Sequence, residues 1–525
     1  MKRAVVLAVL AACAPPDRAP QWKAAGATEP RRGGTLRIAI KDSITSLDPT
    51  IAYDEPSYFA LRMLFETLLD YAPGSTTLVP RLAESWTVSA DAKTYTFSMR
   101  PGVRFSDGSP IVAADVKYSL ERAQTTADSL FAQWLVDVES ITASDTQLVI
   151  QLKHPNAGFA YVMAMPFTTP QRAAHVAKAG AALRRTPLAS GPYMLDEWDE
   201  GVRFAVKRNP SYNGTQPAYL DALVMLENVP RDTQFLMFER GDIDCVDRPS
   251  APDQLWLVTQ DAWKPYVHER PQLVSIGARF DVTQAPFSDR RVRQAFNYAV
   301  DKSHTTKLLA GTTTPAHGIL PPGVSGRDDS LAPYPHDVEK ARALLADAGF
   351  ARGLSITYVT LADEEAEKVA ASMQGDLAEV GVDMTISLVP LATYISMVGK
   401  RGGPAFSYVG WIGDSPDPTN FLDAKFHSRG ITDEAAANDA FYRNPELDAI
   451  LDAARADTDP ASRAARYRRA EQILYTDAPW LWNYHQMFTE VTQPYVRDYV
   501  PHPVWLRDFS STWLDLGPEG ERVAR

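Results

Sequence analysis

The sequence predicts a mixed α/β protein with at least two lobes, and three observations carry this prediction. The chain has 525 residues, more than a single hydrophobic core usually organises. Segments that alternate apolar and polar residues, typical of half-buried strands, recur between segments with helical periodicity. Residues 354–390 follow the order strand, helix, strand, which predicts a parallel βαβ unit.

The first half of the chain is richer in strand patterns. We expect a helix over residues 57–71, where apolar residues recur with helical spacing. The segments on either side of Asp199–Gly201 predict a hairpin, because an acidic, glycine-containing turn separates two alternating runs. The other expected strands are 35–40, 94–100 and 146–152.

The second half has clearer helix boundaries. Asp289 and Asp337 each precede a helical pattern and can accept hydrogen bonds from its first free N–H groups. Gly349 marks the end of the second of these helices. A third helix is expected from about Asp363 to Val380, between strands at 354–360 and 382–390.

Composition and motifs exclude several classes of function. The net charge of −12, with no basic run after the first residues, argues against nucleic acid or anionic lipid as the main partner. No nucleophile elbow, phosphate loop or dinucleotide motif occurs, and the nine histidines and two cysteines show no metal-ligand spacing. We therefore expect no cofactor and no metal. A pair of carboxylates for hydrolysis stays open, because any two acids can meet in space.

The amino terminus predicts export and lipid anchoring. Residues 1–12 have a basic start and a short apolar run, as a signal peptide does, and Leu10–Cys13 resembles the lipobox of bacterial lipoproteins. The alternative is an ordinary signal peptide with a chance cysteine. Residues 13–32, rich in Pro and Ala, suit a linker between the lipid on Cys13 and a folded body. Cys245 is expected to be buried.

The segment "GWIGDSPDPTNFL", residues 410–422, raises a question of function. An apolar strand at 406–412 precedes Asp414, so the carboxylate should stand where the strand ends. Strand ends in α/β folds are common ligand sites. The alternative is that Asp414 only supports the turn, because Asp-Ser-Pro is ordinary turn chemistry.

Several segments together resemble family 5 of the solute-binding proteins of bacterial ABC importers, the group of oligopeptide-, dipeptide- and nickel-binding proteins. The resemblance runs from Gly33 to about Pro503. Each segment alone is weak, and their common order is specific. They are "GGTLRIAI", "LVPRLAESWTVSADAKTYTFSMRPGVRFSDGSPIVAADVKYSLERA", "SGPYMLDEW", "ERGDIDCVD", "APFSDRRVRQAFNYAVDK", "GILPPG", "EKARALLADAGF" and "GWIGDSPDPTNFL".

The resemblance implies a large α/β fold of the periplasmic-binding-protein type II-like class, with two lobes, an extra subdomain and a two-strand hinge. Lobe I would be discontinuous, lobe II would be one segment, and the ligand would be enclosed between them. The implied boundaries are 33–50, 188–271 and 490–525 for lobe I, 51–187 for its extra subdomain, and 272–489 for lobe II.

The resemblance also implies a set of ligand contacts. In peptide binders of this kind the aspartate at the position of Asp414 pairs with the α-amine of the peptide, and Trp411 falls on a neighbouring pocket aromatic. Some of these binders have an arginine shortly before the tryptophan that takes the peptide carboxylate, and this chain lacks it. Lys400 and Arg401 are the expected substitutes, unless they belong to a solvated loop. The other expected wall residues are Tyr53, Asp54, Glu55, Tyr408, Tyr484 and His485.

We therefore expect a monomeric, extracytoplasmic lipoprotein that captures a short peptide and delivers it to the permease and ATPase of an ABC importer. It would not be an enzyme. The alternatives are a receptor of the same fold for an oligosaccharide, an opine or a metal chelate, and a hydrolase or chaperone on this scaffold.

The lipid anchor gives the first testable prediction. Cys13→Ser should move the protein from the membrane fraction to the soluble fraction, since the acyl chains on this cysteine would hold it at the membrane. Cell fractionation with acyl labelling measures this, and Cys245→Ser, which keeps Cys13, is the control. A Cys13→Ser protein that stays with the membrane would contradict the anchor.

Overall fold

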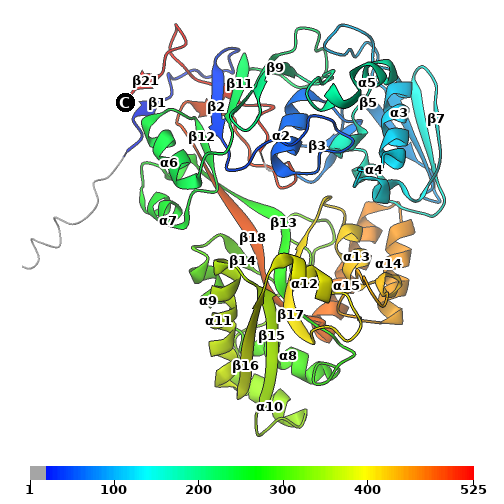
Figure 1. The fold of residues 1–525 in the computed structure, drawn as a ribbon, viewed down its shortest axis with the longest axis vertical. Coiled ribbons are helices and arrows are strands. Elements are labelled where there is room, and N and C mark those ends of the chain that lie inside the picture. Colours follow the sequence, from blue (N-terminus) through cyan, green and yellow to red (C-terminus); the bar gives the residue numbers. More distant parts are fainter. Residues whose placement is uncertain (1–18, 506) are drawn as a thin grey trace, which may run out of the picture.

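The computed structural model describes residues 19–505 and 507–525, and the predicted signal peptide and Cys13 lie outside these residues. Figure 1 shows two lobes, one above the other, joined by two long strands. We refer to them as the upper and lower lobes. The strands that join them are β13 (Val267–Phe280) and β18 (Trp480–Thr492). Helices and strands are mixed throughout, which confirms the predicted α/β class.

One eleven-stranded sheet runs through both lobes. Its order is β16-β15-β17-β13-β18-β12-β2-β11-β10-β9, and β14 pairs separately with β18. The strands of the upper lobe are β2 (Thr35–Ala39), β9 (Tyr193–Asp199), β10 (Arg203–Arg208), β11 (Ala222–Leu226) and β12 (Cys245–Asp247). Those of the lower lobe are β14 (Thr313–Pro315), β15 (Leu354–Leu361), β16 (Val382–Val389) and β17 (Phe406–Ile412).

The two crossing strands pair with each other along most of their length, in antiparallel register. Pro271 pairs with Met487 and Ser275 with His485, so three residues of β13 oppose one of β18 between these pairs. Such an irregularity bends and twists a strand pair. It occurs where β13 leaves the upper lobe, and residues 272 and 489, which we expect to form the hinge, lie within these two strands.

A buried ion pair lies at the upper end of the crossing. Arg270 on β13 lies 3.0 Å from Glu490 on β18, and both side chains are inaccessible to solvent. Asp247 of the neighbouring β12 is 3.6 Å from the same guanidinium. Because buried charges are tolerated only with close partners, this group fixes the register of the strands.

Gly277 allows β13 and β18 to approach closely. A Cβ atom at this position would lie 2.2 Å from the backbone oxygen of Leu481 on β18. The obstacle is backbone, so a change of side-chain rotamer cannot relieve it. The two strands can keep this separation only with glycine here.

The upper lobe contains a second, four-stranded antiparallel sheet, drawn on the right of Figure 1. Its inner face and α3 (Ala113–Thr125) bury one large apolar cluster that includes Tyr95, Phe97 and Ile150. The sheet consists of β5 (Ala83–Val88), β6 (Thr94–Met99), β8 (Gln147–Leu152) and β7 (Val138–Ala143). The remaining helices of this lobe are α2 (Glu55–Leu64), α4 (Phe159–Val162), α5 (Ala173–Ala179), α6 (Arg231–Arg240) and α7 (Ala251–Thr259).

The helix expected over residues 57–71 is shorter than predicted. The helix α2 ends at Leu64, and β3 (Leu69–Tyr71) follows it and pairs with β4 (Leu78–Pro80). All three residues of β3 are buried. Leu69 and Tyr71 fit a strand as well as a helix, and pairing with β4 decides between the two. The buried Asp70 between them forms ion pairs with Arg62 and Arg81.

The expected hairpin and βαβ unit are confirmed. Strands β9 and β10 pair antiparallel, and β15 and β16 pair parallel with α11 (Glu364–Glu379) between them. Asp289 and Asp337 cap their helices through their side chains, as predicted, and Asp363, the expected start of the third helix, caps α11 in the same way. The other helices of the lower lobe are α8 (Arg290–Ala299), α9 (Lys302–Leu308), α10 (Val338–Asp347), α12 (Leu391–Met397), α13 (Leu422–Phe426), α14 (Pro445–Ala456) and α15 (Pro460–Asp477).

Short strand pairs hold both ends of the described chain to the upper lobe. β1 (Trp22–Lys23) pairs with β21 (Val523–Ala524), and β19 (Val496–Arg497) pairs with β20 (Trp513–Leu514). Cys245 on β12 is buried, as expected.

Lys302, on α9, is buried without a carboxylate partner among the described residues. Its ammonium group donates hydrogen bonds to the carbonyl oxygens of Asn297, at 3.0 Å, and Tyr334, at 3.3 Å. Burial lowers the pKa of Lys302 to about 7, although Asp301 and Asp376 oppose this shift. The folded protein therefore releases this proton about three pH units before the unfolded chain does.

This shift predicts that stability rises with pH. Between pH 7 and 9 the unfolded state keeps the proton that the folded state has lost, so the unfolding free energy should rise by up to about 1.4 kcal/mol per pH unit. Urea unfolding of the wild type and of Lys302→Met measures the difference, with the exposed Lys307→Met as control. A difference between wild type and Lys302→Met that does not change with pH would contradict the prediction.

Candidate functional site

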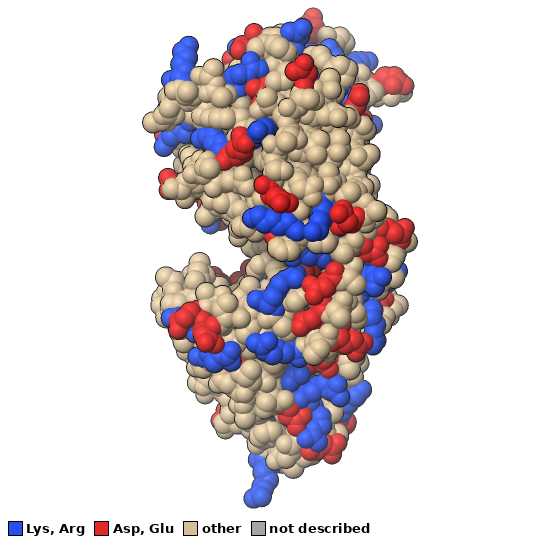
Figure 2. All heavy atoms as spheres, turned by 90° about the vertical axis from the view of Figure 1, so that its right-hand side faces the viewer, with Lys and Arg blue, Asp and Glu red and all other residues tan. Residues whose placement is uncertain are grey.

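Three adjoining hollows form a continuous cleft between the lobes. The upper hollow is lined by residues of the upper lobe only, and the lower hollow by residues of the lower lobe and of the crossing strands. A middle hollow is lined by both lobes and by residues 486–489 of β18. It shares Arg231 and Arg248 with the upper hollow and Glu365 with the lower one. Figure 2 shows from the side that the surface is indented between the lobes.

The upper hollow lies at the carboxyl ends of three strands. The strands β2, β11 and β12 run parallel to one another, so the residues that follow them meet at one edge of the sheet. Lys41 comes shortly after β2, Arg231 begins α6 after β11, and Arg248 directly follows β12. The topology therefore gathers these basic side chains at one place.

The lower hollow contains two of the expected site residues. Tyr408 on β17 and Tyr484 on β18 line it together with Tyr358 on β15. Asp363 and Glu365, at the start of α11, complete its wall, and the hydroxyl of Tyr484 lies 3.4 Å from the Glu365 carboxylate. Burial raises the pKa of Glu365. The hollow is therefore aromatic with an acidic edge.

Asp414 lies two residues beyond the end of β17 and contacts the opposite lobe. Its carboxylate accepts a hydrogen bond of 2.6 Å from the hydroxyl of Tyr53, which precedes α2 in the upper lobe. Burial raises the pKa of Asp414, and the bond from Tyr53 opposes this rise. No basic side chain pairs with Asp414 among the described residues. The carboxylate therefore stands between the lobes with a neutral partner only.

Trp411 is tied to the loop that carries Asp414. Its indole N–H donates to the carbonyl oxygen of Asn420 at 2.7 Å, and the ammonium group of Lys425 lies 5.1 Å from the centre of the ring. Asp417 has a structural role, because its buried carboxylate forms a two-point ion pair with Arg463. These contacts hold the loop rigidly around Asp414.

Asp54 and Glu55 have partners within the upper lobe. The Asp54 carboxylate caps α2 and accepts from the backbone N–H and the hydroxyl of Ser57, both at 2.8 Å. Glu55 forms an ion pair with Arg248 and lines the upper hollow. Of Asp54 and Glu55, only Glu55 therefore lines a hollow in which a ligand could bind, and Asp54 stabilises the start of α2.

His485 lies inside the lower lobe, away from the cleft surface. Its side chain is 0% exposed, and both ring nitrogens have partners: Ser275 at 2.9 Å and Arg327 at 3.1 Å. Burial and the adjacent Arg327 lower the pKa of His485 well below its usual range. A neutral, enclosed ring has no face for a ligand, so we do not propose His485 as a contact.

Lys400 and Arg401 lie in an exposed turn between α12 and β17. Arg401 forms an ion pair of 2.7 Å with Asp433, and Lys400 lies 3.8 Å from Glu434. These contacts are within the lower lobe. The geometry therefore agrees with a solvated loop, the alternative considered for this pair.

The sequence analysis missed several side chains of the cleft, above all Arg231, Arg248 and Glu365. The signal that could have found them is the one that selected Asp414. Arg248 directly follows β12, and Glu365 follows β15 at the start of the predicted helix. Ligands of α/β folds bind at strand ends, and Arg248 and Glu365 stand at such ends as Asp414 does.

Comparison with known proteins identifies the family. The family model "Bacterial extracellular solute-binding proteins, family 5 Middle" matches residues 77–433. The chain is 30% identical over 484 residues to di/tripeptide-binding protein 2 of Pseudomonas aeruginosa (strain UCBPP-PA14), covering 86% of this chain and 89% of that protein. It is 30% identical over 452 residues to glutathione-binding protein GsiB of Escherichia coli (strain K12), covering 85% and 87%.

A solved structure confirms the fold of this family. HbpA2 from Haemophilus parasuis superposes with a TM-score of 0.84 at 24% sequence identity, over 92% of this chain and all of that one. The chain therefore belongs to family 5 of the bacterial extracellular solute-binding proteins. The expected family is confirmed, and so is the expectation of a binding protein rather than an enzyme.

The described residues contain neither a candidate membrane-spanning helix nor a candidate metal site. None of their helices is both long and apolar enough to span a membrane. Within the same ranges, no group of three or more His, Cys, Asp or Glu side chains is arranged to hold a metal ion.

The bond between the lobes predicts a change in the titration of Asp414. Tyr53→Phe removes the hydrogen bond that stabilises the carboxylate, so the pKa of Asp414 should rise further. NMR titration of the side-chain carboxyl carbon measures it in the ligand-free protein. Tyr58→Phe is a matched control, because the Tyr58 hydroxyl has no hydrogen-bond partner among the described residues. An unchanged pKa in Tyr53→Phe would show that this bond does not persist in solution.

Proposed function

We propose that this protein binds a short peptide between its lobes and holds the peptide α-amine with Asp414. The observation that carries the proposal is the state of this carboxylate. It is half-buried, lies between the lobes, and within the described part of the chain has only the neutral hydroxyl of Tyr53 as a side-chain partner. An ammonium group enclosed away from water needs a carboxylate, and here one is available. The ligand amine would take the place of the phenol or join it.

The edge of β17 supports an extended ligand. Within the described chain, β13 pairs along all of β17, whereas β15 pairs with it only at Ser407. The stretch from Tyr408 to Ile412 therefore has one edge without a strand partner among the described residues. A peptide could add to this edge through backbone hydrogen bonds, which do not depend on its side chains. Tyr408 and Tyr484 would then contact the side chains of the ligand.

The relatives support a ligand of two or three residues. One is named for di- and tripeptides and another for glutathione, itself a tripeptide with an unusual linkage. The family description and the predicted signal peptide support a place outside the cytoplasm. We further propose that the protein acts as a monomer, held by lipid on Cys13, and delivers its ligand to the permease and ATPase of an ABC importer.

The role of Asp414 can be tested by a double-mutant cycle. Asp414→Asn should weaken the binding of tri-alanine by about two to four decades, because an enclosed ammonium group without its counter-charge costs about 3–5 kcal/mol. N-acetyl-tri-alanine, which lacks the charge, should bind weakly to both proteins. Calorimetry with the two peptides and the two proteins gives the coupling energy.

The control is Asp433→Asn, which removes one negative charge from the surface of the same lobe. It should leave both affinities unchanged. Additive effects in the cycle, or equal binding of tri-alanine and its acetylated form by the wild type, would exclude the amine contact. The search for the ligand would then turn to sugars, opines and metal chelates.

A further inference from the structure

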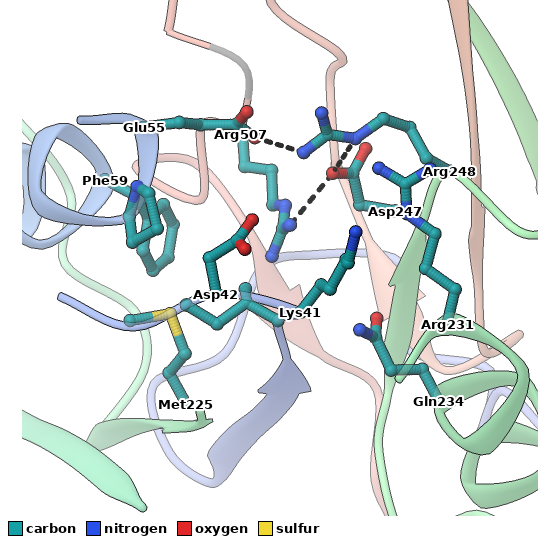
Figure 3. A pocket seen from close by; sticks show the side chains of 12 residues that line it. Lys41, Asp42, Glu55, Phe59, Met225, Arg231, Gln234, Asp247, Arg248 and Arg507 are labelled. Carbon is teal, nitrogen blue, oxygen red and sulfur yellow. Dashed lines mark hydrogen bonds and ion pairs between the residues drawn. The ribbon is translucent and has the colours of Figure 1, made fainter. Parts of the chain in front are cut away.

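The upper hollow is positively charged in a protein that is acidic as a whole. Figure 3 shows the side chains that line it. Four of them are basic: Lys41, Arg231, Arg248 and Arg507. Three are acidic: Asp42, Glu55 and Asp247. The wall therefore has one positive charge in excess, whereas the chain carries a net charge of −12.

The contacts within the hollow show where the excess lies. Asp247, which is buried, lies 2.9 Å from Arg507 and 2.8 Å from Arg248, and Arg248 also pairs with Glu55. Figure 3 marks these three contacts and none to Arg231. Across the described residues, no hydrogen bond or ion pair is made by the Arg231 guanidinium. Loss of hydration in the hollow and the nearby Arg248 lower the pKa of Arg231, while Asp247, Glu55 and Asp42 oppose this shift. Arg231 and Lys41 are thus the two basic side chains of the hollow without an ion-pair partner among the described residues.

We propose that Arg231, with Arg248 beside it, binds a carboxylate of the peptide ligand. The proposal rests on the proposed peptide-binding function and adds the second end of the ligand to it. A guanidinium group presents parallel N–H donors that match the two oxygens of a carboxylate. A ligand carboxylate would supply the counter-charge that Arg231 lacks. The loop residues Lys400 and Arg401 are already paired with acids of the lower lobe.

The position of the hollow relative to Asp414 suits a short peptide. Tyr53 bonds to Asp414, and Glu55, two residues further on, pairs with Arg248. The backbone positions of Tyr53 and Glu55 are two residues apart and therefore at most about 7 Å from each other. Asp414, the proposed amine site, contacts one of these residues, and Arg248, in the proposed carboxylate site, contacts the other. A tripeptide spans at most about 10 Å along its backbone. The ligand would therefore reach from the lower lobe to the upper lobe and link the two.

One other partner for Arg231 must be distinguished. Glu365 of the lower lobe lines the middle hollow together with Arg231. Burial raises the pKa of Glu365 overall, and the charge of Arg231 opposes this rise. If the lobes closed further, these two side chains could pair with each other. The experiment must separate a contact to the ligand from a contact between the lobes.

Calorimetry with tri-alanine and with tri-alanine amide tests the proposal. The wild type should bind the acid about tenfold to a hundredfold more tightly than the amide, the usual range for a hydrogen bond to a charged group. Arg231→Gln should remove this preference by weakening the acid only. Arg240→Gln is the control: it removes an exposed positive charge from the same helix and should change neither affinity. Ala-Glu-Ala amide carries its carboxylate on a side chain instead of the carboxyl terminus. If this carboxylate can replace the terminal one, the wild type should bind Ala-Glu-Ala amide more tightly than tri-alanine amide, and Arg231→Gln should abolish this difference.

Each other outcome overturns the inference. Equal binding of acid, amide and Ala-Glu-Ala amide by the wild type would exclude a carboxylate site and leave the peptide function standing. Equal weakening of all three peptides by Arg231→Gln, reproduced by Glu365→Gln, would assign Arg231 to a contact between the lobes. The same loss in Arg240→Gln would reduce the effect to general electrostatics. If the wild type binds none of the peptides, the proposed function fails and the carboxylate site with it.

Discussion

The pairing of β13 with β18 is the constraint on which the rest of the structure depends. Both strands lie in the middle of the one sheet that runs through the two lobes. The strands of each lobe therefore pair, directly or through their neighbours, with the same two strands. The irregular pairing between Pro271 and Ser275 bends them where the lobes separate. Just above it, the enclosed ion pair of Arg270 and Glu490 resists any slip of register, since a slip would leave two buried charges without partners. The two lobes are therefore joined by one strand pair of defined register.

The walls of the cleft follow from the same arrangement. In the upper lobe the parallel strands point their carboxyl ends at the cleft and bring Arg231 and Arg248 together. In the lower lobe Glu365, at the start of α11, lines the cleft, and the loop after β17 places Asp414 against Tyr53 of the upper lobe. The upper hollow thus has one positive charge in excess, and Glu365 and Asp414 are carboxylates of the lower lobe that face the upper one. A short peptide, with one charge of each sign at its ends, matches this polarity.

The sequence predicted well where local patterns and caps determine structure. Asp289, Asp337 and Asp363 mark helix starts through hydrogen bonds to nearby N–H groups, so their effect is visible in the sequence. The end of α2 was missed, because the short pattern Leu-Asp-Tyr at residues 69–71 fits a helix as well as a strand and only the pairing with β4 separates the two.

For the site, the sequence identified Asp414 by its place after a strand, but its partner Tyr53 lies 361 residues away. Burial of His485 could not be foreseen, since it results from Ser275 and Arg327, which reach it only in the folded chain. The same holds for the pairing of Arg507 with Asp247: acids and bases distant in sequence decide which cation is left without a counter-charge. The sequence alone does not show which charged side chains neutralise one another in the folded protein.

The close approach at Gly277 has a consequence for how this protein can vary. Gly277 lines the lower hollow together with Tyr408 and Tyr484. Any side chain at this position would collide with the backbone of Leu481. A replacement here would force the crossing strands apart and tilt one lobe against the other, whereas a change of the surrounding tyrosines would leave the strand pair in place. The shape of the lower hollow can therefore be altered through its aromatic side chains, but not at Gly277.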